Sequence, residues 1–78
     1  MKDRTKSLEI LTNILHATCG VDPVLVTESS RLIEDLNVDS LGMLEAVIEF
    51  EDAFGVTVDA SLMPPKPTVA DLLDIIHP

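Results

Sequence analysis

Apolar residues at helical spacing, in three segments separated by glycine and proline, constrain the fold of this chain more than any other feature. The segments cover residues 5–18, 40–54 and 69–76. In each of them apolar residues return every three or four positions, as on one face of a helix, whereas a half-buried strand would alternate. Gly20 and Gly55 follow the first two segments, at positions where a left-handed residue commonly ends a helix. The pattern therefore predicts an all-α fold.

The connections between these segments are compatible with antiparallel helix packing. The chain has 78 residues, which is enough for one small domain over residues 1–78. Residues 59–63 are expected to form at most one helical turn capped by Asp59, and the proline-rich stretch 64–67 cannot continue a helix. Thr68 is a suitable N-cap for the last helix. We expect a small antiparallel bundle of three main helices with a short or irregular third element.

The connection over residues 20–38 is long for a domain of this size. Such loops usually carry function or are held in place by their own apolar side chains. The candidate anchors are Val21, Val24, Leu25, Val26, Leu32, Ile33, Leu36 and Val38. We therefore expect this loop to pack against the helices.

Acidic residues outnumber basic ones by 14 to 5, which gives a formal net charge of −9. Nucleic acid is excluded as a partner because its phosphates would be repelled. No Lys or Arg occurs between Arg31 and Lys66, although acids are frequent there. Solubility is one explanation of such a surface. The complete absence of bases favours another, namely attraction of basic-faced partners.

Several functional classes have little support in the sequence. The single cysteine, Cys19, excludes an internal disulfide, and we expect a cytoplasmic protein. No apolar run approaches membrane-spanning length, so we expect no membrane span. His16 and His77 have neither ligand-spaced neighbours nor the positioned acid that a nucleophilic triad needs. We therefore expect no metal site and no catalytic residue.

The segment from Ser40 to Phe54 carries more apolar surface than a helix on a core requires. The stripe expected to face the core consists of Met43, Ala46, Val47, Phe50 and Phe54. A neighbouring strip consists of Leu41, Leu44 and Ile48, beside Glu45, Glu49 and Asp52. An apolar strip edged by carboxylates is typical of a transient partner-binding surface. The alternative is that Leu44 and Ile48 pack under the long loop.

Ser40 stands at the start of this helix, between Asp39 and Leu41. A serine there usually accepts hydrogen bonds from free backbone amides. Asp39 could do this unaided, which would turn the Ser40 hydroxyl outward, and neither Gly42 nor Met43 can complete a capping box. The helix N-terminus would also favour an attached phosphodiester, and Gly42 offers no side chain to obstruct an enzyme approaching the hydroxyl. Taken alone, Asp39-Ser40-Leu41 still favours capping.

Several stretches, in register, resemble the acyl carrier proteins, small helical proteins that carry 4′-phosphopantetheine. These stretches are Gly20-Val21-Asp22-Pro23, Leu32 to Leu36, Asp39-Ser40-Leu41, Glu45 to Val56 with its Glu-Asp-x-Phe-Gly-Val ending, and Thr68 to Leu72. Asp-Ser-Leu alone recurs by chance, whereas its combination with these flanks is specific. The resemblance covers nearly the whole chain and implies the four-helix bundle of that family.

The resemblance also implies a function. Ser40 would be esterified by a phosphopantetheinyl transferase that uses coenzyme A, and Asp39 and Leu41 match motif positions that the transferase reads. The protein would carry acyl thioesters between enzymes of fatty acid, polyketide or related acyl metabolism, as a monomer that catalyses nothing. The helix face that would meet basic patches on acyl-processing enzymes consists of Leu41, Glu45, Ile48, Glu49 and Asp52.

Two departures from the family pattern and two alternative functions remain open. Asn37 stands where the family often has glycine, and asparagine tolerates a left-handed backbone. The stretch from Met63 to Pro67 replaces a commonly acidic short helix. An aminoacyl or peptidyl carrier of nonribosomal peptide synthesis would use the same arm, although the acidic helix favours an acyl carrier. An unmodified acidic adaptor would use Ser40 only as a helix-start residue.

Overall fold

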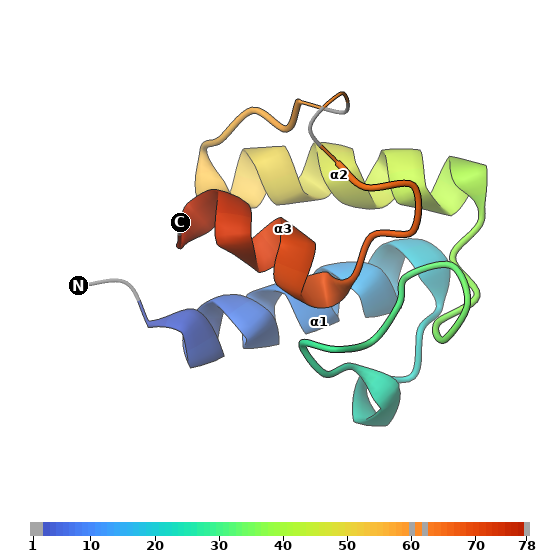
Figure 1. Cartoon of the computed structure of the whole chain (residues 1–78). Helices are drawn as coiled ribbons and strands as arrows, with labels where there is room; N and C mark the ends of the chain where they lie inside the picture. Colours follow the sequence, from blue (N-terminus) through green and yellow to red (C-terminus); the bar gives the residue numbers. More distant parts are fainter. Residues whose placement is uncertain (1–2, 60, 62, 78) are drawn as a thin grey trace.

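Helices dominate the computed structural model, which describes residues 3–59, 61 and 63–77. The elements in chain order are α1 (Arg4–Cys19), the short 3₁₀ helix η1 (Pro23–Leu25), α2 (Ser40–Phe54) and α3 (Val69–Ile76). Helices α1 and α2 run in opposite directions, and α3 packs beside them (Figure 1). No strand occurs among the residues that the structure describes. The prediction of a small all-α bundle is confirmed.

The ends of α2 and α3 fall where the sequence predicted, and α1 extends one residue beyond the predicted range 5–18 at each end. Gly20 and Gly55 follow α1 and α2 in the left-handed conformation, with φ of 69° and 64°. Thr68 and Asp71 form a reciprocal capping box at the start of α3, in which each side chain accepts a hydrogen bond from the other residue's backbone amide. The Asp3 side chain caps α1. Local capping chemistry therefore sets the bounds of all three helices.

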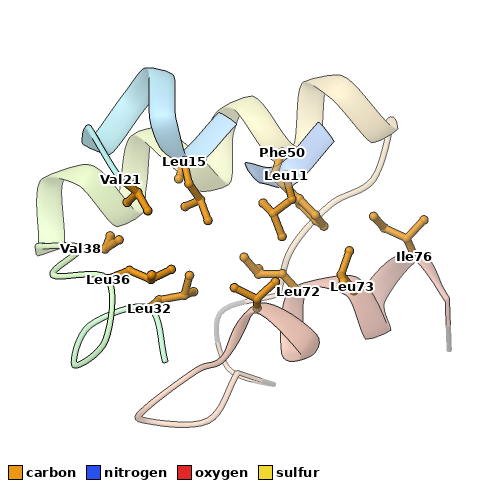
Figure 2. Packing of buried hydrophobic residues seen from close by; sticks show 12 residues of the cluster. Leu11, Leu15, Val21, Leu32, Leu36, Val38, Phe50, Leu72, Leu73 and Ile76 are labelled. Atoms are coloured by element: carbon orange, nitrogen blue, oxygen red, sulfur yellow. The ribbon is translucent and has the colours of Figure 1, made fainter. Parts of the chain in front are cut away.

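The core lies where the inner faces of α1, α2 and α3 meet the long loop (Figure 2). Its buried apolar members are Leu11, Leu15, Val21, Leu32, Leu36, Val38, Ala46, Phe50, Val69, Leu72, Leu73 and Ile76. Phe50 is fully buried, and its ring centroid lies 5.0 Å from that of the partly buried Phe54. The predicted inner stripe of α2 is confirmed for Met43, Ala46, Phe50 and Phe54, whereas Val47 is not among the core residues.

The loop over residues 20–38 packs as predicted, but with only some of the expected anchors. Val21, Leu32, Leu36 and Val38 are buried, and Val26 packs partly against them. The prediction is wrong for Val24, Leu25 and Ile33, which are 86%, 55% and 49% exposed. Val24 and Leu25 lie on η1, a single turn that buries none of its residues. Ile33 points outward because Leu32 and Leu36, four positions apart, occupy the inner face of their turn.

Backbone hydrogen bonds join this loop to the start of α3. The Leu32 amide donates to the Pro67 carbonyl at 3.0 Å, and the Val69 amide donates to the Ser30 carbonyl at 3.0 Å. Between these two bonds, Arg31 and Thr68 form an isolated antiparallel bridge. The loop therefore has a fixed position on the bundle although it contains little regular structure.

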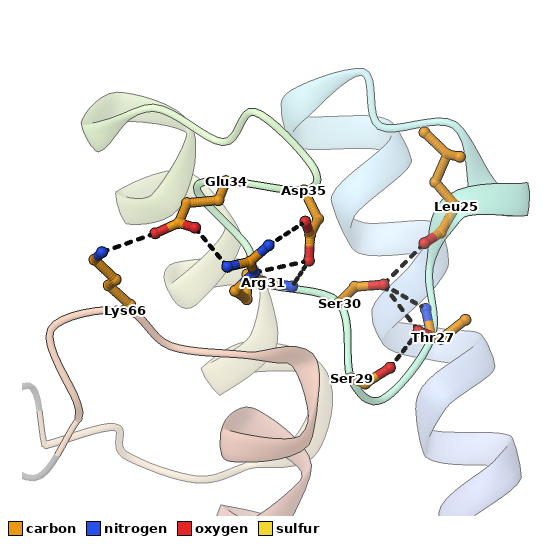
Figure 3. Close-up of polar contacts among 8 residues, drawn as sticks. All are labelled: Leu25, Thr27, Ser29, Ser30, Arg31, Glu34, Asp35 and Lys66. Atoms are coloured by element: carbon orange, nitrogen blue, oxygen red, sulfur yellow. Dashed lines mark hydrogen bonds and ion pairs between the residues drawn. The ribbon is translucent and has the colours of Figure 1, made fainter.

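Side chains reinforce the same junction (Figure 3). The Arg31 guanidinium pairs with Asp35 at 3.1 Å and with Glu34 at 2.6 Å, and the Lys66 ammonium pairs with Glu34 at 3.1 Å. The hydroxyl of Ser30, a buried residue, donates to the Leu25 carbonyl at 2.9 Å. These ion pairs involve Arg31 and Lys66, the two basic residues that flank the acidic interval of the sequence.

Between α2 and α3, residues 56–59 and 63–67 are not helical, and Ser61 has 3₁₀ geometry. The expected helical turn over residues 59–63 includes residues 60 and 62, which lie outside the described residues. The Asp59 carboxylate accepts hydrogen bonds from the Ser61 amide at 3.0 Å and from the Ser61 hydroxyl at 2.6 Å, and these bonds lower the pKa of Asp59. The described part of this segment agrees with the short or irregular third element that the sequence predicted.

Candidate functional site

Asp39 alone performs the capping at the N-terminus of α2. Its backbone is extended, with φ of −86° and ψ of 178°, and its Oδ1 accepts a hydrogen bond from the Gly42 amide at 2.7 Å. Its carbonyl oxygen accepts a hydrogen bond from the Met43 amide at 2.8 Å. No reciprocal capping box accompanies these bonds. The Gly42 amide is therefore satisfied without a contribution from the neighbouring serine.

Ser40 is the first residue of α2 and is exposed. Its hydroxyl makes no hydrogen bond with the part of the chain that the structure describes. A helix N-terminus carries a partial positive charge, which favours a negatively charged group attached at this position. The Ser40 Oγ is thus a free, accessible hydroxyl in an environment suited to a phosphodiester.

The backbone before α2 is held firmly, which fixes the position of Ser40. Asn37 adopts a left-handed conformation with φ of 55°, as its side chain permits. Val38 is buried, and its amide donates to the Leu32 carbonyl at 3.0 Å. The chain therefore enters Asp39 from a buried and hydrogen-bonded residue, which fixes the backbone position from which the Ser40 side chain extends.

Gly42 is buried and serves the packing of α2 on α1. A Cβ at this position would lie 3.0 Å from Asp39 Oδ1 and 3.1 Å from Cys19 Sγ. The Cys19 thiol also donates to the Gly42 carbonyl at 3.3 Å. The prediction that Gly42 clears an approach to the Ser40 hydroxyl is therefore wrong. The missing side chain instead lets the first turn of α2 approach the end of α1.

The outer face of α2 combines apolar and acidic side chains, as the sequence predicted. Leu41, Leu44 and Ile48 are 64%, 57% and 54% exposed, so the alternative in which Leu44 and Ile48 pack under the loop is wrong. Glu45, Glu49 and Asp52 are exposed beside them. Together, Leu41, Glu45, Ile48, Glu49 and Asp52 are called the acidic face below.

The negative charge of the acidic face is not neutralised within the described chain. Arg4 pairs with Glu28 and Asp74, while Arg31 and Lys66 pair with acids of the long loop. No ion pair to a described residue involves an acid of α2. These carboxylates are consequently available to a basic partner.

A narrow apolar groove begins at Ser40 and runs between α2 and the irregular segment. Its volume is about 310 Å³, and it is lined by Ser40, Met43, Leu44, Val47, Val58, Met63 and Pro67. No sequence motif places Val58, Met63 and Pro67 in a site. Their apolar character was a visible signal, but only the fold shows that they face α2.

Each of the two histidines forms a hydrogen bond within the fold, and the bond of His77 reaches a residue of α1. His16 Nδ1 lies 3.1 Å from the Val21 carbonyl oxygen, and His77 Nε2 lies 2.9 Å from Ser7 Oγ. Among the described residues, no cluster of three or more His, Cys, Asp and Glu side chains is arranged to hold a metal ion. Nor does any helix in that part of the chain have the length and apolarity needed to cross a membrane.

Comparisons with known proteins identify the family of this chain. Residues 9–76 match the family model described as "Phosphopantetheine attachment site". An acyl carrier protein of Thermotoga maritima is 37% identical over 77 residues, which cover 99% of this chain and 95% of that protein. One from Coprothermobacter proteolyticus is 35% identical, over 96% of this chain and 92% of that protein. A meromycolate extension acyl carrier protein of Mycolicibacterium aurum is 32% identical, over 86% of this chain and 69% of that protein. Together, the family match and these relatives show that the chain belongs to the acyl carrier protein family, whose prosthetic group is 4′-phosphopantetheine.

Proposed function

We propose that Ser40 Oγ is the attachment atom for 4′-phosphopantetheine and that the protein carries acyl groups between enzymes. The observation that supports this assignment most is that Asp39 and Ser40 have different roles at the start of α2. Asp39 caps the helix with a 2.7 Å bond to the Gly42 amide, which leaves the exposed Ser40 hydroxyl free. When bound, the prosthetic group supplies a thiol that holds an acyl group as a thioester.

The residues around Ser40 would support this role without reacting themselves. The positive end of the α2 dipole would stabilise the phosphodiester. Asp39 and Leu41 would be read by a phosphopantetheinyl transferase, since they flank the hydroxyl and are both exposed. No residue of the chain is assigned a catalytic step, so the protein would be a carrier only.

The acidic face would bind the partners. Its carboxylates form no ion pair with described residues, and its leucine and isoleucine side chains are exposed, so a basic patch with an apolar centre would complement it. The partners proposed are the transferase and acyl-processing enzymes with basic patches. We further propose that residues 1–78 act as one carrier domain and as a monomer, since a net charge of −9 disfavours self-association.

The apolar groove at Ser40 favours acyl over aminoacyl cargo. Its walls are almost entirely aliphatic or thioether side chains, which suit an alkyl chain better than a charged amino acid. The relatives named above are acyl carrier proteins, one of them for meromycolate extension. We therefore propose fatty acid, polyketide or related acyl metabolism as the setting, in the cytoplasm.

Intact mass spectrometry tests the attachment. The folded protein is incubated with coenzyme A and a promiscuous phosphopantetheinyl transferase. Wild type and a matched control, Ser29→Ala, should each gain one phosphopantetheine, whereas Ser40→Ala should gain none. Ser29 suits the control because it is another exposed serine outside α2. An unmodified wild type would instead support the acidic adaptor.

A further inference from the structure

A furrow follows the seam between α1 and α2, on a different side of α2 from the apolar groove. One hollow of about 200 Å³ lies at the Ser40 end, and its lining includes Thr18, Asp39, Leu41 and Glu45. A second hollow of about 520 Å³ is lined by Ile10, Asn13, Ile14, Ala17, Thr18 and Glu49. Thr18 lines both, so the two hollows adjoin and form one furrow along the seam.

The two walls of the furrow differ in chemistry. The α1 wall is largely aliphatic, with Ile10 37% exposed and Ala17 exposed. The α2 wall presents Glu45 and Glu49, which form no ion pair with any residue that the structure describes. Ile14 also packs against the core, whereas Ile10 and Ala17 are not among the core residues of α1, so their exposed surface is available beside the unpaired carboxylates.

We propose that this furrow, the α1–α2 seam, is a second docking surface for an acyl-processing enzyme. The occupant is a segment of that enzyme with an aliphatic side chain next to a lysine or arginine. The aliphatic side chain lies against Ile10 and Ala17, and the cation faces Glu45 and Glu49. This inference rests on the proposed carrier function, and it extends the partner surface from the acidic face onto α1.

Electrostatics favours a basic enzyme segment over a second copy of this chain as the occupant, and it also sets the orientation of that segment. A second copy of this chain would bring another net charge of −9 to an acidic wall, so self-association is disfavoured. Lys6 lies one helical turn before Ile10 and is exposed, so it repels a cation at that end of the furrow. The basic residue of the partner therefore points toward the Ser40 end, where the acids lie.

An NMR titration with a bacterial ketoacyl synthase as the probe tests the surface directly. Isotope-labelled protein without its prosthetic group is used, so the result does not depend on loading. We expect amide shifts or line broadening at Ile10, Ile14 and Ala17 as well as on α2. Shifts confined to α2 and residues 56–68 would overturn the proposal, as would an absence of binding. Concentration-dependent shifts at Ala17 without synthase would overturn it in favour of a second copy.

A matched pair of variants measures the contribution of the α1 wall. Ala17→Arg places a cation and a long side chain in the furrow, whereas Val24→Arg makes the same charge change on η1, at a residue that lines neither hollow. We expect Ala17→Arg to weaken synthase binding about tenfold, which is a moderate hot-spot effect, and Val24→Arg to change it less than about twofold. Equal effects of the two variants would contradict the proposal.

The transferase reaction separates this inference from the proposed function. Both variants retain Ser40 and should gain one phosphopantetheine by mass. If they are loaded normally but bind the synthase equally well, the seam proposal fails while the carrier function stands. If wild type binds the synthase through the seam but is never loaded, the attachment proposal fails instead.

Discussion

At the scale of single residues, Asp39 and Ser40 differ in what their side chains contribute to folding. Asp39 Oδ1 accepts from the Gly42 amide at 2.7 Å, whereas the Ser40 hydroxyl has no described partner. A serine and an aspartate at a helix start are often interchangeable as caps. Here the aspartate takes that position, and the serine hydroxyl remains available for the attachment that we propose. The two side chains should therefore respond in opposite ways to truncation.

Removing each side chain tests this division. Asp39→Ala removes the cap and should lower the free energy of unfolding by about 1 kcal/mol. Ser40→Ala removes no hydrogen bond and should change it by less than about 0.5 kcal/mol. Urea unfolding followed by circular dichroism measures both. A loss at Ser40→Ala as large as that at Asp39→Ala would show that the hydroxyl is used by the fold.

Gly42 offers a second test at this scale. An exposed helical glycine usually gains about 1 kcal/mol on replacement by alanine. We expect no such gain from Gly42→Ala, because its Cβ would lie 3.1 Å from Cys19 Sγ. Removing that sulfur should relieve this contact, although the Cβ would still lie 3.0 Å from Asp39 Oδ1, so in a double-mutant cycle with Cys19→Ala the two changes should couple by about 0.5 kcal/mol or more. If the two changes in the free energy of unfolding are simply additive, the Cβ at position 42 and the Cys19 sulfur do not contact each other.

At the scale of elements, α2 has two faces that serve different purposes. Its inner face, centred on Ala46 and Phe50, packs into the core, and its outer face presents exposed apolar and acidic side chains. Because the outer side chains contribute little to packing, they can change without loss of the fold. This separation would allow one helix to hold the bundle together and to bind the partners that we propose.

Charge reversal on α2 tests its role in binding. Glu49→Lys should weaken binding of the phosphopantetheinyl transferase and reduce the dependence of binding on salt, because an attractive interaction is replaced by repulsion. Glu9→Lys makes the same change at an exposed position on α1 and is the matched control. Titrations at low and high salt give the affinities, and circular dichroism checks the fold. Unchanged affinity for Glu49→Lys, Glu45→Lys and Asp52→Lys alike would contradict the account of the acidic face.

Elements that depend on neighbouring residues were predictable from the sequence, and contacts between distant segments were not. Helical periodicity together with Gly20, Gly55 and Thr68 located the helices, because capping acts within a few residues. The exposure of Val24 and the inward position of Gly42 depend on what the rest of the fold places beside them. Hydrophobicity alone does not contain that information.

At the scale of the whole molecule, the long loop and the start of α3 form one unit. Backbone bonds pair Leu32 with Pro67 and Ser30 with Val69, and the Arg31 side chain holds Asp35 in the same loop (Figure 3). This junction was not foreseen, since its partners are far apart in sequence. It positions Val38, and through it the start of α2, so a distant contact supports the Ser40 site.

The pH dependence of stability tests this junction. The Arg31 side chain and then its backbone amide donate to Asp35, which lowers the pKa of that carboxyl from its ordinary value of 3.8. Because the folded-state pKa is the lower one, the stabilisation is complete above 3.8 and is lost as pH falls through the folded-state value. Asp35→Asn should therefore be less stable than wild type at neutral pH, and the difference should shrink below that range. A difference that is independent of pH, measured by urea unfolding, would contradict this account.

The account depends most on the Ser40 hydroxyl, and locating the modification within the chain tests it most directly. Wild-type protein loaded from coenzyme A is digested, and its peptides are fragmented in the mass spectrometer to find the modified residue. We predict one phosphopantetheine, on Ser40, in every loaded molecule. Phosphopantetheine on another serine, or loading that persists in Ser40→Ala, would contradict the central claim.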